Sequence, residues 1–146
     1  MLSVTPEKTY MGRLPYGVDL QEELNRICRV NKIKLGRVEA IGAVKKARLG
    51  YYDQSDRSYR FVEREQRLEI LNLTGNVSIK DGEPFVHAHL TLGDHAGLAF
   101  GGHLMPGTIV FACEVIVQKY GGKPLERGFD EQTGLPLWSD SALSSS

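Results

Sequence analysis

The alternation of apolar and polar residues in the segment 86–92, V-H-A-H-L-T-L, is typical of a β-strand with one buried face. Successive side chains of a strand point to opposite faces, so His87 and His89 share the face that is not buried. The segment follows Asp81-Gly82, which is the strongest hairpin signal in the chain. We therefore expect it to pair antiparallel with a strand at residues 69–79.

The same period-2 pattern, or a short apolar run bounded by turn residues, predicts strands along most of the chain. Beyond the pair above, these strands cover residues 9–14, 37–52, 58–62, 98–104 and 108–120. The stretch 37–52 is too long for one straight strand, and its glycines, Gly42 and Gly50, indicate a bend or a bulge. We therefore expect one strongly curved, mainly antiparallel sheet.

One amphipathic helix is predicted after the first strand, and no second helix of comparable strength is found. Asp19 is a favourable N-cap, with Glu22 three residues later. Apolar residues then recur at the spacing of a stripe that faces the core, namely Leu20, Leu24, Ile27 and Cys28. The predicted fold class is α/β, more narrowly α+β: a curved antiparallel sheet with one main helix packed on it.

The composition favours a single domain over residues 1–146, with a core at about residues 9–120 and a flexible tail at about residues 139–146. The 18 Lys and Arg residues balance the 18 Asp and Glu residues, so no global field attracts nucleic acid or an anionic membrane. Cys28 and Cys113 are expected to be buried thiols in a reducing compartment. The chain has no signal-peptide pattern and no long apolar run, so we expect a cytoplasmic protein.

All four histidines of the chain lie between residues 84 and 104. His87 and His89 are separated by about 6.6 Å along a strand, so both rings can lean toward one ion. His103 ends another short apolar run and follows Gly101-Gly102, where missing side chains let a neighbouring backbone approach. The sequence therefore predicts a metal site formed by these three histidines, with His95 outside it in a turn.

An alternative interpretation is that the histidines are hydrogen-bonded surface or interface residues, as is common on the polar face of a strand. If they bind a metal, imidazole ligands without a nearby cysteine favour zinc, and nickel, copper and iron remain alternatives. Because neutral imidazole is the ligand, we expect metal occupancy to fall as the pH drops through about 6.5.

Four ordered motifs point to a known family. They are G-R-V-E-A-I-G-A-V-K-K-A-R-L-G-Y-Y at 36–52, E-I-L-N-L-T-G-N-V-S at 69–78, D-G-E-P-F-V-H-A-H-L at 81–90 and G-G-H-L-M-P-G at 101–107. Together they resemble the PPC domain, the plants and prokaryotes conserved domain, in its stand-alone prokaryotic form, over about residues 9–120. The resemblance implies the PPC-domain fold, an antiparallel sheet with one main helix, assembled as a homotrimer. The histidine pattern is also similar to the three-histidine zinc site of acetolactate decarboxylase.

A three-histidine site leaves a coordination position open, which favours a metal-dependent enzyme acting on a small carbonyl or carboxylate substrate. The catalytic residues beyond the metal ligands are unknown. Glu39 and Glu69 are candidate acids or bases. Candidate anion-binding residues are Arg13, Arg48 and Arg67.

A second hypothesis is a DNA-binding or protein-interaction module, as the plant members of the PPC family imply. Basic residues cluster near the end of the predicted helix and again in the next loop and strand, at Arg26, Arg29, Lys32, Lys34, Arg37, Arg57, Arg60, Arg64 and Arg67. Plant members carry an AT-hook, whose Arg-Gly-Arg-Pro core is absent here, so we expect only weak DNA binding. A third hypothesis is a structural trimer whose histidines bind metal, or one another, across subunits.

Overall fold

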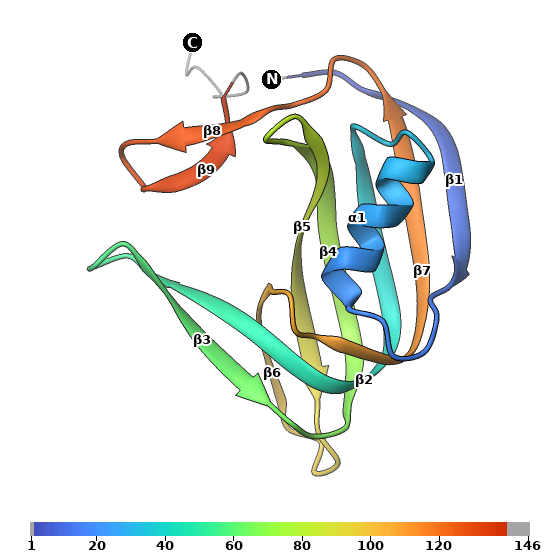
Figure 1. The fold of residues 1–146 in the computed structure, drawn as a ribbon, viewed down its shortest axis with the longest axis vertical. Coiled ribbons are helices and arrows are strands. Elements are labelled where there is room, and N and C mark those ends of the chain that lie inside the picture. Colours follow the sequence, from blue (N-terminus) through green and yellow to red (C-terminus); the bar gives the residue numbers. More distant parts are fainter. Residues whose placement is uncertain (1, 140–146) are drawn as a thin grey trace.

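Seven of the nine strands between residues 2 and 139, the range that this computed structural model describes, form one antiparallel sheet. They are β1 (Thr5–Arg13), β2 (Gly36–Asp53), β3 (Ser58–Arg64), β4 (Leu68–Lys80), β5 (Glu83–Gly93), β6 (Ala99–Leu104) and β7 (Ile109–Gly121). Their order is β1-β7-β2-β4-β5-β6, with β3 paired to the second half of β2. Strand β6 also pairs with β2 at Leu49 and Gly50, so the sheet curls back on itself (Figure 1).

Helix α1 (Leu20–Val30) covers one face of this sheet, here called the inner face (Figure 1). Asp19 caps it by accepting a hydrogen bond from the backbone N–H of Glu22 at 3.0 Å, as the sequence predicts. The helix is tied to β5 at Val86, whose carbonyl accepts from Gln21 and whose N–H donates to Asn25, both at 2.8 Å. The predicted fold class, a mainly antiparallel sheet with one helix, is confirmed.

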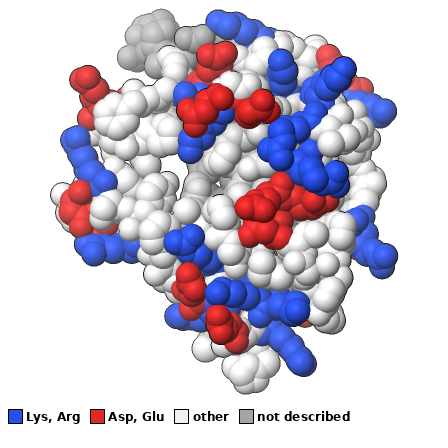
Figure 2. Space-filling view, in the orientation of Figure 1, with Lys and Arg blue, Asp and Glu red and all other residues white. Residues whose placement is uncertain are grey.

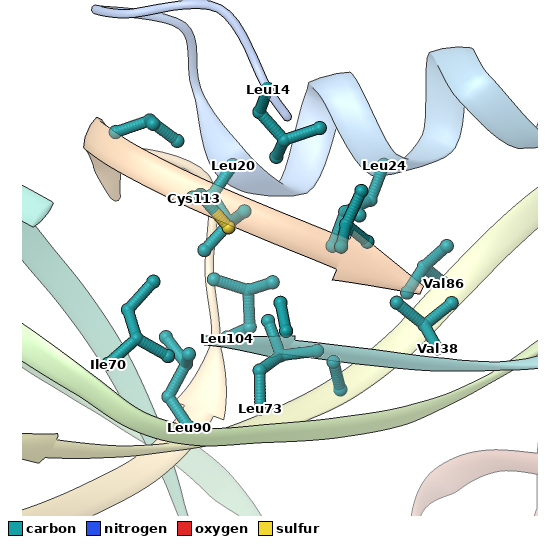
Figure 3. Packing of buried hydrophobic residues seen from close by; sticks show 14 of the residues in the cluster. Leu14, Leu20, Leu24, Val38, Ile70, Leu73, Val86, Leu90, Leu104 and Cys113 are labelled. Carbon is teal, nitrogen blue, oxygen red and sulfur yellow. The ribbon is translucent and has the colours of Figure 1, made fainter. Parts of the chain in front are cut away.

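The core lies between the helix and the inner face (Figure 3). Leu24 from the helix belongs to one buried cluster with Val38, Leu73, Val86 and Leu104 from four different strands, and these side chains are at most 1% exposed. The two thiols, Cys28 and Cys113, are also buried and form no disulfide. Burial of alternate residues on each strand therefore leaves the intervening side chains on the opposite, outer face.

Two local predictions based on glycine residues are confirmed. Asp81 and Gly82 both have positive φ, 51° and 81°, and they connect the paired residues Lys80 and Glu83 as a two-residue hairpin. Gly42 has φ of 143° and coincides with a shift of register between β2 and β4. The irregularity at Gly42 lets the long β2 bend.

A short second sheet was not predicted. It consists of β8 (Arg127–Asp130) and β9 (Leu135–Trp138), and β8 begins beside the end of β4 that extends beyond its pairing with β2. The N–H of Ile79 on β4 donates to the carbonyl of Leu125 at 2.8 Å. Leu125 is buried although it follows residue 120, where the predicted core ends. Ser139 is bonded to Glu126, and the rest of the expected tail, residues 140–146, lies outside the described residues.

Between residues 2 and 139, no helix is long and apolar enough to span a lipid bilayer.

Candidate metal centre

The pairing of β5 with β6 brings three histidines together on the outer face of the sheet. His89 on β5 lies opposite His103 on β6, and His87 lies two residues before His89. One ring nitrogen from each histidine lies within 4.8 Å of the other two. The three rings that the sequence groups together therefore lie together within one chain.

The spacing of these rings suits a single ion. The Nε2 atom of His87 and the Nδ1 atom of His103 are 3.2 Å apart. Two nitrogens bound tetrahedrally to zinc at about 2.0–2.1 Å are separated by about 3.4 Å. The ring centroids are 4.8 Å apart for this pair and 5.3 Å for each pair that includes His89. Because His89 is exposed, a small rotation of its side chain would bring its nitrogen to a similar separation.

The glycines before His103 allow the close approach of β6. A Cβ atom added at Gly101 would overlap the carbonyl oxygen of Leu90 on β5. One added at Gly102 would lie 2.9 Å from the carbonyl oxygen of Gly50 on β2. Side chains at these two positions would push β6 away from both neighbours, and His103 would move with it.

Burial keeps two of the rings neutral. Desolvation lowers the pKa of His87 to about 4, and the positive charge of Arg127 adds to the effect. Desolvation also lowers the pKa of His103 to about 4, with contributions from His89 and Arg127. Neutral imidazole is the form that binds metals, so protons compete with a metal for these two rings only at more acidic pH than expected. The sequence predicts that metal occupancy falls as the pH drops through about 6.5, which is the pKa of a solvated imidazole. Because burial lowers the pKa of His87 and of His103 to about 4, these two rings should become protonated only near pH 4.

His95 lies apart from the cluster, in the exposed turn between β5 and β6. The carboxylate of Asp94 organises this turn by accepting from the N–H groups of Ala96 and Leu98, at 2.9 and 3.0 Å. His95 therefore lies in a separately organised turn outside the cluster, as the sequence predicts.

The two candidate acids or bases lie away from the three histidines. Glu39 shares the outer face but stands two strands away, because it is opposite Thr74 on β4, which is opposite His89. Glu69 pairs with Gly93 toward the other end of β4 and β5. Neither carboxylate is therefore the cross-strand neighbour of any of the three histidines.

The three candidate anion-binding arginines are also elsewhere. Arg13 and Arg67 are exposed, on β1 and before β4. The Arg48 guanidinium lies over the ring of Phe61 at 4.4 Å and forms an ion pair with Glu63 at 3.2 Å. These arginines are therefore exposed or paired at the surface, and a sequence pattern does not distinguish such roles from ligand binding.

Two residues that flank the cluster were missed. The charge of Arg127 on β8 acts on both His87 and His103. The ring of Tyr59 on β3 packs against the His103 ring at a centroid distance of 5.7 Å, and burial raises the pKa of its hydroxyl. The segment D-E-Q-T-G at 130–134, between two short apolar segments, is a hairpin signal that could have identified the strand carrying Arg127.

A cavity of about 780 Å³ lies on the outer face beside His87 and His89. This volume falls within the range of about 300–1,000 Å³ that is typical of small-molecule sites. Most of its wall is apolar or aromatic, and the residues concerned are Leu2, Val4, Leu35, Val77, Tyr120, Leu125 and Trp138. The histidines, with Arg37, Thr74 and Asn76, form the polar part of a cavity whose remaining wall suits hydrocarbon.

A curled antiparallel sheet, one covering helix and three clustered histidines on the opposite face, all within residues 2–139, define a small β-rich protein with a candidate metal centre. The chain belongs to the Plants and Prokaryotes Conserved (PCC) domain family, whose sequence pattern matches residues 1–121. This is the PPC domain that the four sequence motifs resemble, so the expected family is confirmed.

Solved structures of similar proteins cover nearly the whole chain. A metal-containing protein from Archaeoglobus fulgidus is 45% identical, with a TM-score of 0.90, over 94% of this chain and 97% of that chain. A plant- and prokaryote-conserved protein from Pyrococcus horikoshii is 35% identical, with a TM-score of 0.91, over 98% and 100%. A protein from Bacteroides thetaiotaomicron, provisionally described as DNA-binding, is 25% identical, with a TM-score of 0.83, over 92% and 96%.

Other comparisons concern longer proteins. Two Synechococcus proteins named bifunctional protein GlmU are each 39% identical over 111 residues, which is 75% of this chain. The chain spans only 16% and 17% of the length of these relatives. Acetolactate decarboxylase from Bacillus subtilis subspecies spizizenii is 14% identical, with a TM-score of 0.51, over 80% of this chain and 53% of that chain. This last likeness concerns the fold alone.

Proposed function

We propose that His87, His89 and His103 together bind one divalent transition metal, with zinc the metal best suited to the site. The observation that carries the proposal is the convergence of three imidazole nitrogens within 4.8 Å on one face of the sheet. Three neutral nitrogen ligands suit zinc, and nickel, copper and iron also accept imidazole. The similarity to the metal-containing protein of Archaeoglobus fulgidus, at 45% identity, supports the same proposal.

The proposed centre serves a small-molecule function. Three protein ligands leave at least one position for water or a ligand, and a metal there would polarise a bound carbonyl or acidify a bound water. The adjoining cavity of about 780 Å³ gives such a ligand a place beside His87 and His89. A metal-dependent reaction on a small carbonyl or carboxylate compound is therefore the activity that the site supports best.

Metal content of the protein purified without a histidine tag tests the binding proposal. We expect about one equivalent of metal per chain in the wild type and well below one in His87→Ala and His103→Ala. His95→Ala is the matched control, because it removes an imidazole from the exposed turn outside the cluster. Stoichiometric metal in either cluster variant, or its loss in the control, would contradict the assignment.

The chain is also proposed to assemble as a homotrimer, as the family resemblance implies. The outer face carries exposed apolar residues that a partner subunit would cover, namely Met11, Ile41, Leu71 and Ile116, at 76%, 57%, 52% and 36% exposed. Met11 pairs with Ile116, which is joined through Glu39 and Thr74 to His89 in one row across the sheet. A subunit that covers these residues would therefore approach the cavity.

DNA binding is the second candidate function, favoured by the provisional description of the Bacteroides protein. Several cations of the basic clusters are paired with acids in the folded chain, as in Arg26 with Glu23 and Arg60 with Asp56. On the face shown in Figure 2, Lys and Arg side chains are interspersed with Asp and Glu. Such a surface gives little net attraction for phosphates, so we expect DNA binding to be weak.

A further inference from the structure

The β8–β9 hairpin carries a half-buried arginine to the edge of the three-histidine cluster. Arg127 donates from Nε to the Ser78 hydroxyl and from Nη2 to the Asn76 side-chain oxygen, both at 2.8 Å. Its Nη1 donates to the carbonyl of Pro136 at 3.0 Å. Asn76 is the cross-strand partner of His87, and cross-strand partners point to the same face of a sheet. The guanidinium therefore lies next to His87 on the outer face.

The position of this guanidinium is fixed on several sides. It lies over the rings of Phe85 and Trp138, at 5.8 and 6.0 Å from their centroids. The far end of the hairpin is fastened to the β2–β3 hairpin, because the Tyr52 hydroxyl donates to the carbonyl of Thr133 at 2.7 Å. Arg57 adds a bond to the carbonyl of Glu131 at 3.2 Å. Arg127 is thus held in place before any ligand arrives, which lowers the entropic cost of binding.

Within residues 2–139, the positive charge of Arg127 is not compensated by an acidic side chain. None of the ion pairs between residues 2 and 139 includes Arg127. All three of its hydrogen bonds go to neutral acceptors. A guanidinium has five N–H groups, so Nη1 and Nη2 each retain one for a further acceptor. Burying a cation without a counter-ion is costly, which favours an anion as the missing partner.

The cavity supplies the rest of the binding site. Asn76 and His87, the two side chains that connect Arg127 with the cluster, line it together with Trp138 from the same hairpin, and Arg127 adjoins the cavity through its bond to Asn76. Leu2, Val4 and Leu35 make up part of its apolar wall. A ligand that fills this space would place a polar end at the histidines and a hydrocarbon end against the wall.

We propose that the cavity binds a small carboxylic acid with a 2-oxo or 2-hydroxy group and an apolar side chain, whose carboxylate is held by Arg127. This inference rests on the proposed metal centre, which would take the 2-oxygen. Two free N–H groups on one planar guanidinium match the two oxygens of a carboxylate. The apolar side chain would lie against Leu2, Val4 and Leu35. Arg127 is a ligand-binding residue in this proposal and not a metal ligand.

The test uses the full chain loaded with cobalt, whose visible absorption responds to a new ligand. The probe is 4-methyl-2-oxopentanoate, and the comparison is methyl isobutyl ketone, which keeps a carbonyl and an apolar group but lacks the carboxylate. We expect saturable binding of the acid and at least about tenfold weaker binding of the ketone, since a charge-assisted hydrogen bond is lost. Equal affinities for the two compounds would overturn the proposal without any variant.

Variants then locate the anion site. Arg127→Gln should keep about one cobalt per chain and weaken binding of the acid about tenfold or more, whereas Arg127→Lys should retain part of the affinity. Arg29→Gln is the matched control, because it removes one exposed cation from helix α1, on the opposite face of the sheet, and it should change the affinity by less than about twofold.

The outcomes separate this inference from the metal proposal. A wild type that holds cobalt but binds the acid no better than Arg127→Gln overturns the inference alone. A wild type that holds no cobalt overturns the metal centre and the inference together. If Arg127→Gln does not fold, the comparison of Arg127→Lys with Arg29→Gln decides, and equal affinities in these two would count against Arg127.

Discussion

The metal-free protein should lose stability on mild acidification because two neutral histidines are buried in the folded state. Their pKa is about 4 in the folded protein, for His87 and for His103. In the unfolded chain an imidazole titrates at about 6.5. Between these values the unfolded state binds more protons, so the free energy of unfolding falls as the pH falls. The loss should begin near pH 6.5 and end near pH 4, where the folded state also becomes protonated.

The magnitude follows from the same two pKa values. One imidazole with these values loses about 1.8 kcal/mol of stabilisation between pH 7 and pH 5. Both rings are partly exposed, so solvent screening reduces the sum. We expect a loss of about 2 kcal/mol for His87 and His103 together. That is a substantial fraction of the stability of an ordinary domain, which is about 5–15 kcal/mol.

Urea unfolding of the chelator-treated protein at pH 7 and at pH 5 measures this loss, at one fixed protein concentration because assembly shifts apparent stability. The double variant His87→Asn, His103→Asn is the control, since it removes both titrating rings and keeps the carboxylates that also respond to acid. We expect the variant to lose about 2 kcal/mol less than the wild type over this interval. Equal losses in the two proteins would refute the conclusion that these rings are buried in their neutral form.

Three further predictions concern the core, the assembly and DNA. Leu24→Ala should cost about 3 kcal/mol in urea unfolding, because this fully buried side chain joins the helix to the sheet. Val30→Ala, at a helix position that is 66% exposed, should cost less than about 1 kcal/mol, and similar costs would contradict the packing described. Sedimentation should give a trimer at micromolar concentration, and Ile41→Asp in the exposed outer-face residues should shift it toward smaller species; a wild-type monomer would rule out the homotrimer. A gel-shift with duplex DNA at physiological salt should give affinity weaker than micromolar, so sub-micromolar binding would show the DNA expectation to be wrong.

The sequence by itself determined the elements whose signals are local. Alternation along residues 86–92 predicts a strand that directs His87 and His89 to one face, because the side-chain period of a strand is 2. Asp81-Gly82 predicts the turn into that strand, because both positions of this hairpin require positive φ. Asp19 predicts the start of the helix, because its side chain satisfies an N–H that the helix leaves free.

The tertiary structure decided which distant residues meet. The register of β5 against β6 places His103, the proposed third ligand, opposite His89. Register depends on the pairing between strands and not on one strand alone. Glu39 is a candidate acid or base and Arg48 a candidate anion-binding residue. In the folded sheet, however, Glu39 lies two strands from His89 and Arg48 forms an ion pair with Glu63. Arg127 lies on a strand of four residues, which is too short to give a periodic signal. It reaches the histidines only because β4 extends beyond the last residue that it pairs with β2. A contact that depends on where another strand ends is not encoded in any local stretch of sequence.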